Sequence, residues 1–247
     1  MLSVHCTATG LTDIGKVRQE NQDAFAIDDD LGLYVVADGM GGMEEGGLAA
    51  RFVVEGLPTL IRQKLALADE RSAEAVGALL EEAVGSLNGL LRQRAGKGTG
   101  ATVVLALLNG RDACVAHLGD SPAFLCHEGR LEKLTRDHNV AALLVETGRI
   151  TPEEARVHPG RHSLTAYVGM PGKARPELKR VALHAGDRLL LCTDGLAGVV
   201  ADEDILRILA ETPEAVEAAG KLIDRANEGG GYDNITAVLI DCQQEGA

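Results

Sequence analysis

Four aspartates stand beside apolar segments of the chain, where a buried strand would begin or end. Asp38, Asp120 and Asp194 each end such a segment, in LYVVADG, CVAHLGDS and RLLLCTDG. Asp233 comes just before a fourth segment, in GYDNITAVLI. No lysine or arginine lies close enough in sequence to any of them to suggest a dedicated salt-bridge partner. Because an unpaired buried charge costs several kcal/mol, we expect something else to compensate these carboxylates.

If the four aspartates converge, each pair about 4 Å apart repels by about 4 kcal/mol at an effective dielectric constant of about 20. One or two divalent cations would offset this repulsion most simply. A ligand set made only of oxygen atoms favours Mg²⁺ or Mn²⁺ over Zn²⁺. The alternative is that each Asp-Gly pair forms an ordinary hairpin turn, which is the commoner meaning of a single instance. Four such acids together favour the metal site.

Arg18 precedes another acidic segment, in GKVRQENQD. Two interpretations are open for this side chain. It could form a surface ion pair worth less than about 1 kcal/mol. Alternatively, its planar guanidinium could hold a phosphate group next to the cations.

Two further patterns have simpler explanations. Asp28, Asp29 and Asp30 lie between two expected strands beside a glycine, so they predict a solvated turn rather than a nucleophile pair. His158 and His162 have a spacing seen in zinc sites but lack a second pair of ligands, so exposed histidines are expected.

Composition limits the classes of function. The formal charge of -13 disfavours nucleic-acid binding, and the 45% apolar content supports a substantial core. Five cysteines without a C-x-x-C pair indicate reduced thiols, with Cys114 and Cys192 expected in the core. The start of the chain shows no signal peptide, and the longest strongly apolar segment, Thr102–Leu108, is far shorter than a membrane helix. We therefore expect a soluble cytoplasmic protein.

The order of the expected elements indicates an α+β fold with antiparallel sheets, in one domain over residues 1–247, because neighbouring strands come as hairpins. The region 157–175 lacks periodicity and is expected to be a mobile surface excursion. The helix over 47–65 is expected to be bent or interrupted at Pro58. Strands are expected at 3–9, 24–27, 33–37, 102–108, 113–118, 123–127, 180–183, 189–192 and 235–241. Helices are expected at 47–65, 72–94 and 138–147, in a short segment from Thr151, and at 202–211 and 213–227.

Seven motifs occur in one order along nearly the whole chain. They are GKVRQENQDAF, VVADGMGG, GTGATVV, HLGDSPAFL, LTRDHN with VETGRITPEEA, LCTDGL and GGYDNITAV. Together they make the chain similar to the metal-dependent protein phosphatases of the 2C family, in the compact bacterial branch. The resemblance implies two antiparallel β-sheets sandwiched between layers of helices, an α-β-β-α order. It also implies a flap over about 145–169 that borders the active site and influences substrate access.

The resemblance implies a metal centre of two Mn²⁺ or Mg²⁺ ions, with a weaker third. Asp38 would bridge the two ions, the Gly39 carbonyl would complete one site, and Asp194 and Asp233 would complete the other. Asp120 would join Asp194 in holding the third ion. Asp38, Asp194 and Asp233 are therefore the expected catalytic residues.

The resemblance also assigns residues around the metal centre. Arg18 would grip the substrate phosphate, while Gln22, Asp23 and Asn234 would support the ligands from behind. Three positions depart from the family pattern. Gln22 replaces a frequent glutamate, which predicts lower metal affinity or rate. Pro122 replaces an arginine and affects a local contact. Met40 stands where the eukaryotic branch has a candidate general-acid histidine.

The implied activity is hydrolysis of phosphoserine or phosphothreonine in proteins by a metal-activated water, without a covalent enzyme intermediate. Substrates would be phosphorylated proteins made by a serine/threonine kinase, and the enzyme is expected to be a monomer that binds neither nucleic acid nor membrane. Two alternatives stay open. The chain could be a noncatalytic sensor or scaffold that binds phosphoproteins, or a metal phosphoesterase acting on a small molecule.

Overall fold

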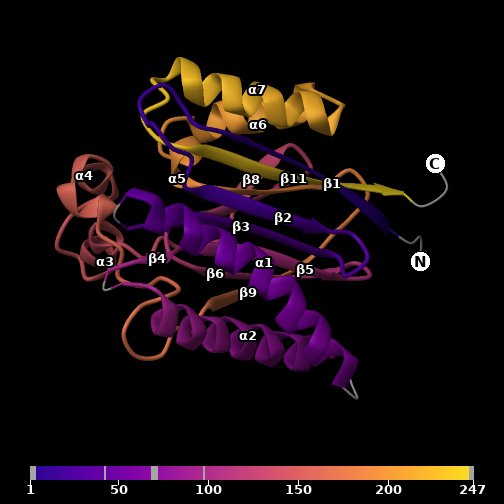
Figure 1. Cartoon of the computed structure of the whole chain (residues 1–247). Coiled ribbons are helices and arrows are strands. Elements are labelled where there is room, and N and C mark those ends of the chain that lie inside the picture. Colours follow the sequence, from indigo (N-terminus) through magenta and orange to yellow (C-terminus); the bar gives the residue numbers. More distant parts are fainter. Residues whose placement is uncertain (1–3, 42, 68–71, 97, 245–247) are drawn as a thin grey trace.

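Two antiparallel sheets lie face to face, and helices cover the outer face of each (Figure 1). The computed structural model describes residues 4–41, 43–67, 72–96 and 98–244. The predicted α-β-β-α order of layers is confirmed. No helix in these ranges is both long and apolar enough to cross a membrane.

The five-stranded sheet joins the two ends of the chain, because the first and last strands pair along ten residues. Its strand order is β1-β11-β10-β7-β8. Its strands are β1 (Val4–Asp13), β7 (Ala123–His127), β8 (Arg130–Lys133), β10 (Arg188–Cys192) and β11 (Ile235–Gln244).

The six-stranded sheet has the order β2-β3-β5-β6-β9, with a short β4 paired to the end of β3. Its strands are β2 (Asp23–Asp28), β3 (Leu33–Met40), β4 (Gly100–Ala101), β5 (Val103–Asn109), β6 (Asp112–Leu118) and β9 (Glu177–Ala182).

Central strands of both sheets are buried on both faces. Between the sheets, side chains such as Tyr34, Val104, Leu189 and Val238 form one apolar cluster. Further clusters lie between each sheet and its helices. This double burial explains why β3, β5 and β10 read as continuous apolar runs rather than alternating ones.

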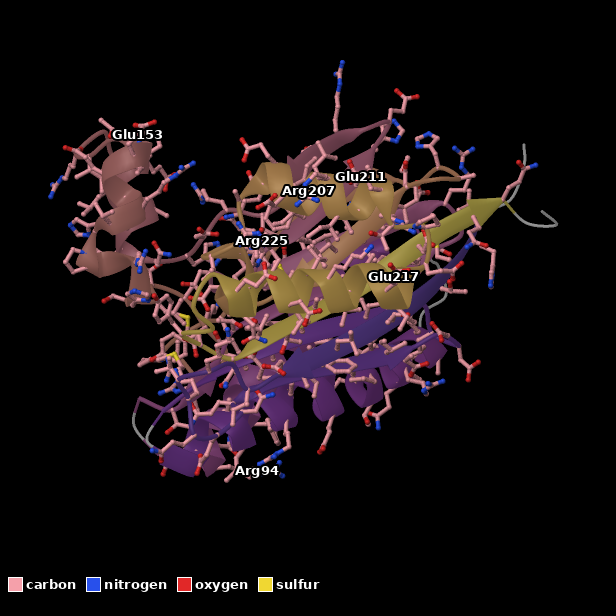
Figure 2. The ribbon with its side chains drawn as sticks, turned by 90° about the horizontal axis from the view of Figure 1, so that it is seen from above. Arg94, Glu153, Arg207, Glu211, Glu217 and Arg225 are labelled. Carbon is pink, nitrogen blue, oxygen red and sulfur yellow. The ribbon has the colours of Figure 1, made fainter. Side chains whose placement is uncertain are left out.

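The six-stranded sheet is covered by α1 (Met43–Leu67) and α2 (Ala73–Arg94), while α5 (Asp194–Ala197), α6 (Asp202–Glu211) and α7 (Ala215–Glu228) cover the other sheet (Figure 1). Figure 2 shows Arg207, Glu211, Glu217 and Arg225 on α6 and α7. Each of these two helices turns its apolar side chains, including Ile205 on α6, toward the sheet. Both helices are therefore amphipathic covers.

A small helical lobe formed by α3 (Val140–Glu146) and α4 (Pro152–Val157) protrudes at one end of the sheets (Figures 1 and 2). Thr151 caps α4 in a capping box with Glu154, as the sequence predicts. The region 157–175 has more structure than expected. A 3-10 turn covers Pro159–His162, and isolated bridges join Leu164 to Asn139 and Val168 to Ala101.

Most expected elements are confirmed to within a few residues, and α6 matches its predicted bounds. Ser3, the expected start of the first strand, lies outside the described residues. The helix expected over 47–65 is longer at both ends and is not interrupted at Pro58. The sequence interpretation missed β4, β8 and α5, which are short and lack an apolar period of their own.

Candidate metal and phosphate site

The four predicted acids lie where strands begin or end. Asp38 is near the end of β3, and Asp120 follows β6 by two residues. Asp194 is the first residue of α5, two positions after β10. Asp233 comes two positions before β11. All four side chains keep partial access to solvent, so they do not belong to the closed core.

The electrostatics show that these acids converge. Burial by surrounding protein, followed by the charges of Asp23, Asp194, Asp233 and Asp120, raises the pKa of Asp38 well above its ordinary value. Burial and the charge of Asp233 also raise the pKa of Asp194, although a hydrogen bond with Asp38 opposes the shift. Carboxyl groups that raise each other's pKa in this way need either protons or cations to be stable together.

Asp120 belongs to the same group. Burial, followed by the charge of Asp194, raises the pKa of Asp120 to about 7. Its Oδ2 atom accepts a hydrogen bond of 3.4 Å from Asn139 Nδ2, which opposes the shift. Sequence interpretation did not single out Asn139, although it is the last residue of the LTRDHN motif.

Asp23 is the most enclosed acid of the site. It pairs directly with Asp38 across β2 and β3. Its Oδ2 accepts hydrogen bonds from Thr193 Oγ1 at 2.9 Å and Thr236 Oγ1 at 2.7 Å, whereas its buried Oδ1 has no hydrogen-bond partner. Burial raises the pKa of Asp23 to about 7 against those two hydrogen bonds. A buried carboxylate oxygen without a partner is a position that a cation or its water would satisfy.

Thr193 and Thr236 were missed as site residues. Both hydroxyls are buried, and each lies within three positions of a predicted acid. The sequence shows them only as a threonine in each of two motifs: Thr193 in LCTDGL and Thr236 in YDNIT. Threonine is so common in strands that this signal alone carries little information.

Arg18 lies in the loop between β1 and β2 and pairs with Asp233 at 2.8 Å between Nη2 and Oδ2. A cationic partner for one of the four acids therefore exists, although it is 215 positions away in sequence. The Arg18 side chain is 52% exposed, so about half of it faces solvent. It stands beside the acids, where it could contact a phosphate group.

Asn234 fastens this loop to the start of β11. Its Oδ1 accepts from Gln22 N at 2.8 Å, and its Nδ2 donates to the carbonyls of Ile14 and Glu20 at 3.0 and 2.9 Å. These bonds span the segment that carries Arg18. Asn234, which the sequence predicts to support the ligands, thus holds the segment that carries Arg18.

Gly39 sits against the backbone of Gly46 at the start of α1. A Cβ atom at position 39 would lie 2.0 Å from the Gly46 carbonyl oxygen and 2.7 Å from the Gln22 carbonyl oxygen. The Gly39 amide donates to the Gln22 carbonyl at 3.1 Å. Only glycine fits here without moving the backbone, so the residue holds the end of β3 close to both neighbours.

Donor atoms in this site are carboxylate and carbonyl oxygens, the ligand class preferred by Mg²⁺ and Mn²⁺. Elsewhere in the described ranges, two groups of three ligating side chains have donor atoms within 4.8 Å of one another, and neither includes these acids. Among the described residues, no three of the four acids have ligand atoms that all lie within 4.8 Å of one another. Their carboxylate oxygens and the unpartnered buried Oδ1 of Asp23 are of the type that these divalent cations bind.

Comparisons with known proteins identify the family of this chain. The family model for protein phosphatase 2C matches residues 15–228. The serine/threonine protein phosphatase PstP of Mycobacterium tuberculosis is 37% identical over 235 residues, covering 93% of this chain. The chain spans only 44% of the length of that relative. A serine/threonine phosphatase of Listeria welshimeri is 32% identical over 238 residues and matches over 93% of both chains.

A solved structure is similar over nearly all of this chain. The catalytic domain of PstP, in complex with two manganese ions, has a TM-score of 0.80 and 32% sequence identity, with 98% of this chain and 100% of that one covered. The chain therefore belongs to the protein phosphatase 2C family.

Proposed function

We propose that this chain is a metal-dependent phosphatase that removes phosphate from phosphoserine and phosphothreonine in proteins. The observation that carries the proposal is the convergence of Asp38, Asp120, Asp194 and Asp233, whose neighbouring charges raise carboxyl pKa values across the site. Such an arrangement costs stability unless it serves to bind cations. Family membership and the names of the relatives support the substrate class.

Asp38, Asp194 and Asp233, with the carbonyl oxygen of Gly39, would hold two Mn²⁺ or Mg²⁺ ions, and Asp120 with Asp194 a weaker third. When bound, such ions lower the pKa of a coordinated water from 15.7 toward about 7 and offset charge on phosphoryl oxygens. The two manganese ions reported for the PstP catalytic domain support this assignment.

Arg18 would bind the phosphate group of the substrate. Its exposed guanidinium carries several N–H donors, and only one bond from it to Asp233 is formed in the structure. A phosphate dianion bound beside Asp233 would accept hydrogen bonds from the N–H groups of Arg18 that Asp233 does not use. Because Asn234 fixes the loop, Arg18 needs little rearrangement to orient the phosphorus atom.

The finer parts of the proposal concern partners, location and domain organisation. The substrates would be proteins phosphorylated by a serine/threonine kinase. The enzyme would be a cytoplasmic monomer that binds neither nucleic acid nor membrane. The buried free thiols of Cys114, Cys126 and Cys192 support a reducing compartment. Residues 1–247 would form one catalytic domain. The lobe over 145–169 would be the flap that influences substrate access.

Asp194→Asn tests the proposal while keeping the shape of the side chain. Turnover of a phosphopeptide in Mn²⁺ buffer should fall by more than about 100-fold, because losing a residue that only supports a ligand already costs about 10- to 100-fold. Glu217→Gln, on the outer helix α7, is the matched control and should keep full activity. If Asp194→Asn retained normal turnover, the proposal would be wrong. If the native protein bound phosphopeptides without hydrolysing them, the sensor alternative would be supported instead.

A further inference from the structure

A second group of ligating side chains lies at the other end of β10 from the acids. His127 is the last residue of β7, His184 lies between β9 and β10, and Asp187 immediately precedes β10. One donor atom from each lies within 4.8 Å of the other two. β10 separates Asp187 from Asp194, so the two sites are about 20 Å apart along an extended strand.

Asp187 forms the fixed centre of this group. Its side chain is only 3% exposed, and its Oδ1 lies 2.6 Å from His127 Nδ1. Its Oδ2 accepts from the His184 amide at 2.8 Å and lies 3.5 Å from His184 Nδ1. In the described ranges, the ion pairs of Asp187 involve only these two histidines. The Gly186 amide donates to the Cys242 carbonyl, and the Cys242 amide donates to the Asp187 carbonyl, which holds the turn in place.

The arrangement suits a metal ion with little change. Ligands about 2.1 Å from a tetrahedral ion lie about 3.4 Å apart, close to the present separation of His184 Nδ1 from Asp187. His127 would have to move away from Asp187 by about 0.8 Å, and its 40% exposed side chain is free to do so. The rings of His127 and His184 are tilted by 43° to each other rather than stacked. Glu128 Oε2 lies 4.0 Å from His127 Nε2, the ring nitrogen that does not face Asp187, so it is not one of the ligands.

The other close group, formed by His117, His138 and Glu177, is held by hydrogen bonds and by an ion pair of Glu177 with Arg136. His117 Nε2 donates to the Arg136 carbonyl at 2.8 Å. His138 Nδ1 accepts from the Gly119 amide at 3.2 Å, which leaves the proton of the neutral ring on Nε2, facing Glu177. The rings stack with centroids 4.6 Å apart. This group is a hydrogen-bonded cluster rather than a metal site.

We propose that His127, His184 and Asp187 bind a transition-metal dication of the Zn²⁺ and Cu²⁺ class, independently of the catalytic cations. Imidazole nitrogens favour these metals, whereas the all-oxygen catalytic site favours Mg²⁺ and Mn²⁺. Binding through His127 Nδ1 replaces the hydrogen bond to Asp187: a neutral ring keeps its single proton on Nε2, whereas a protonated ring releases one proton to solvent. The ion joins the end of β7 to the connection that leads from β9 into β10, at the edge where β7 and β10 pair. It therefore fixes that connection to the five-stranded sheet at the end remote from the catalytic acids.

Nitrogen coordination distinguishes this site from the catalytic centre. With excess Mg²⁺ filling the oxygen sites, one equivalent of Cu²⁺ should give an electron paramagnetic resonance spectrum with hyperfine splitting from two imidazole nitrogens. Asp194→Asn should give the same spectrum, and so should the control variant His158→Ala, which removes a different histidine. His127→Ala and His184→Ala should each lose the two-nitrogen pattern. An unchanged spectrum in both of these variants would overturn the proposal.

Zn²⁺ affinity provides a second measurement. By isothermal titration in excess Mg²⁺, His184→Ala should bind Zn²⁺ at least about 10-fold more weakly than the native chain. Its side chain is half exposed, so the variant should fold. Asp187→Asn should show a similar loss while preserving the side-chain shape. Zn²⁺ should also raise the melting temperature of the native chain but not of either variant. Equal affinities in native and variant chains would show that these residues do not bind the metal.

Discussion

The aspartates of this protein differ in whether their charged neighbours are arginines or other acids. Asp241 has a buried arginine as its partner, and Asp204 has two arginines at the surface. Asp38 and Asp194 have mainly each other and further acids. Because like charges in a low-dielectric setting repel strongly, these last two residues destabilise the metal-free fold at neutral pH. Their presence is explained by a function that needs them.

Arg18→Ala should weaken substrate binding more than it weakens the fold. We expect the KM for a phosphopeptide to rise about 10-fold or more, since a charge-assisted hydrogen bond contributes about 1.5–3 kcal/mol. The exposed pair with Asp233 should contribute less than about 1 kcal/mol to stability. Steady-state kinetics and urea unfolding measure the two effects. Arg18→Lys is the control and should recover part of the binding, because it keeps the charge and loses the fork. An unchanged KM in Arg18→Ala would contradict the assigned role.

His117 gives stability a dependence on pH. Burial lowers the pKa of His117, although its bond to the Arg136 carbonyl opposes the shift. Below about pH 6.5, the ordinary pKa of histidine, His117 is protonated in the unfolded chain but stays neutral in the folded chain. The contribution to stability is therefore constant above about pH 6.5 and is lost as the pH falls toward the folded pKa.

His117→Gln keeps a side-chain N–H for the Arg136 carbonyl but cannot titrate. Below about pH 6.5 the native chain should lose stability relative to this variant, while above that pH the difference between them should be constant. Urea unfolding in EDTA from about pH 5 to about pH 8 measures the difference. A difference that stays constant over the whole range would show that His117 does not carry this dependence.

Among the elements, α6 and α7 depend on one buried arginine at the start of β10. Arg188 donates to the carbonyl of Leu209 in α6 and to those of Thr212 and Pro213 in the connection to α7. It also pairs with Asp241 of β11. The side chain is only 9% exposed. It therefore fixes the helical layer to the sheet.

Arg188→Met should lower the free energy of unfolding by about 3–5 kcal/mol, because it leaves a nearly buried carboxylate and carbonyl groups without a partner. Arg207→Ala is the matched control at an exposed pair on α6 and should cost less than about 1 kcal/mol. Urea midpoints of both variants test the comparison. Similar losses in the two would contradict the proposed anchoring.

Elements could be predicted where the sequence carries a strong local signal. The apolar repeat of α2, its Ser72 cap and the Thr151 capping box all identified helices correctly. Short elements could not be predicted so well, since β8 has only four residues and α5 begins at an acid interpreted as a strand end. Pro58 does not interrupt α1, because packing of the helix on the sheet outweighs one lost hydrogen bond.

At the scale of the whole molecule, the fold brings together residues from both ends of the chain. Pairing of β1 with β11 brings the loop of Arg18 beside Asp233, which no local pattern in the sequence could reveal. The four acids could be predicted because each stands beside an apolar strand. Three hydrogen bonds could be found only from the structure. Thr193 and Thr236 donate to Asp23, and Asn139 donates to Asp120.

Metal titration of the metal-free protein tests the central claim most directly. Phosphopeptide turnover should be absent in EDTA and should rise as about two equivalents of Mn²⁺ bind, with binding followed in parallel by calorimetry. The same titration of Asp38→Asn should show weaker uptake and no turnover. Undiminished turnover in EDTA, or full Mn²⁺ uptake by Asp38→Asn, would contradict the account.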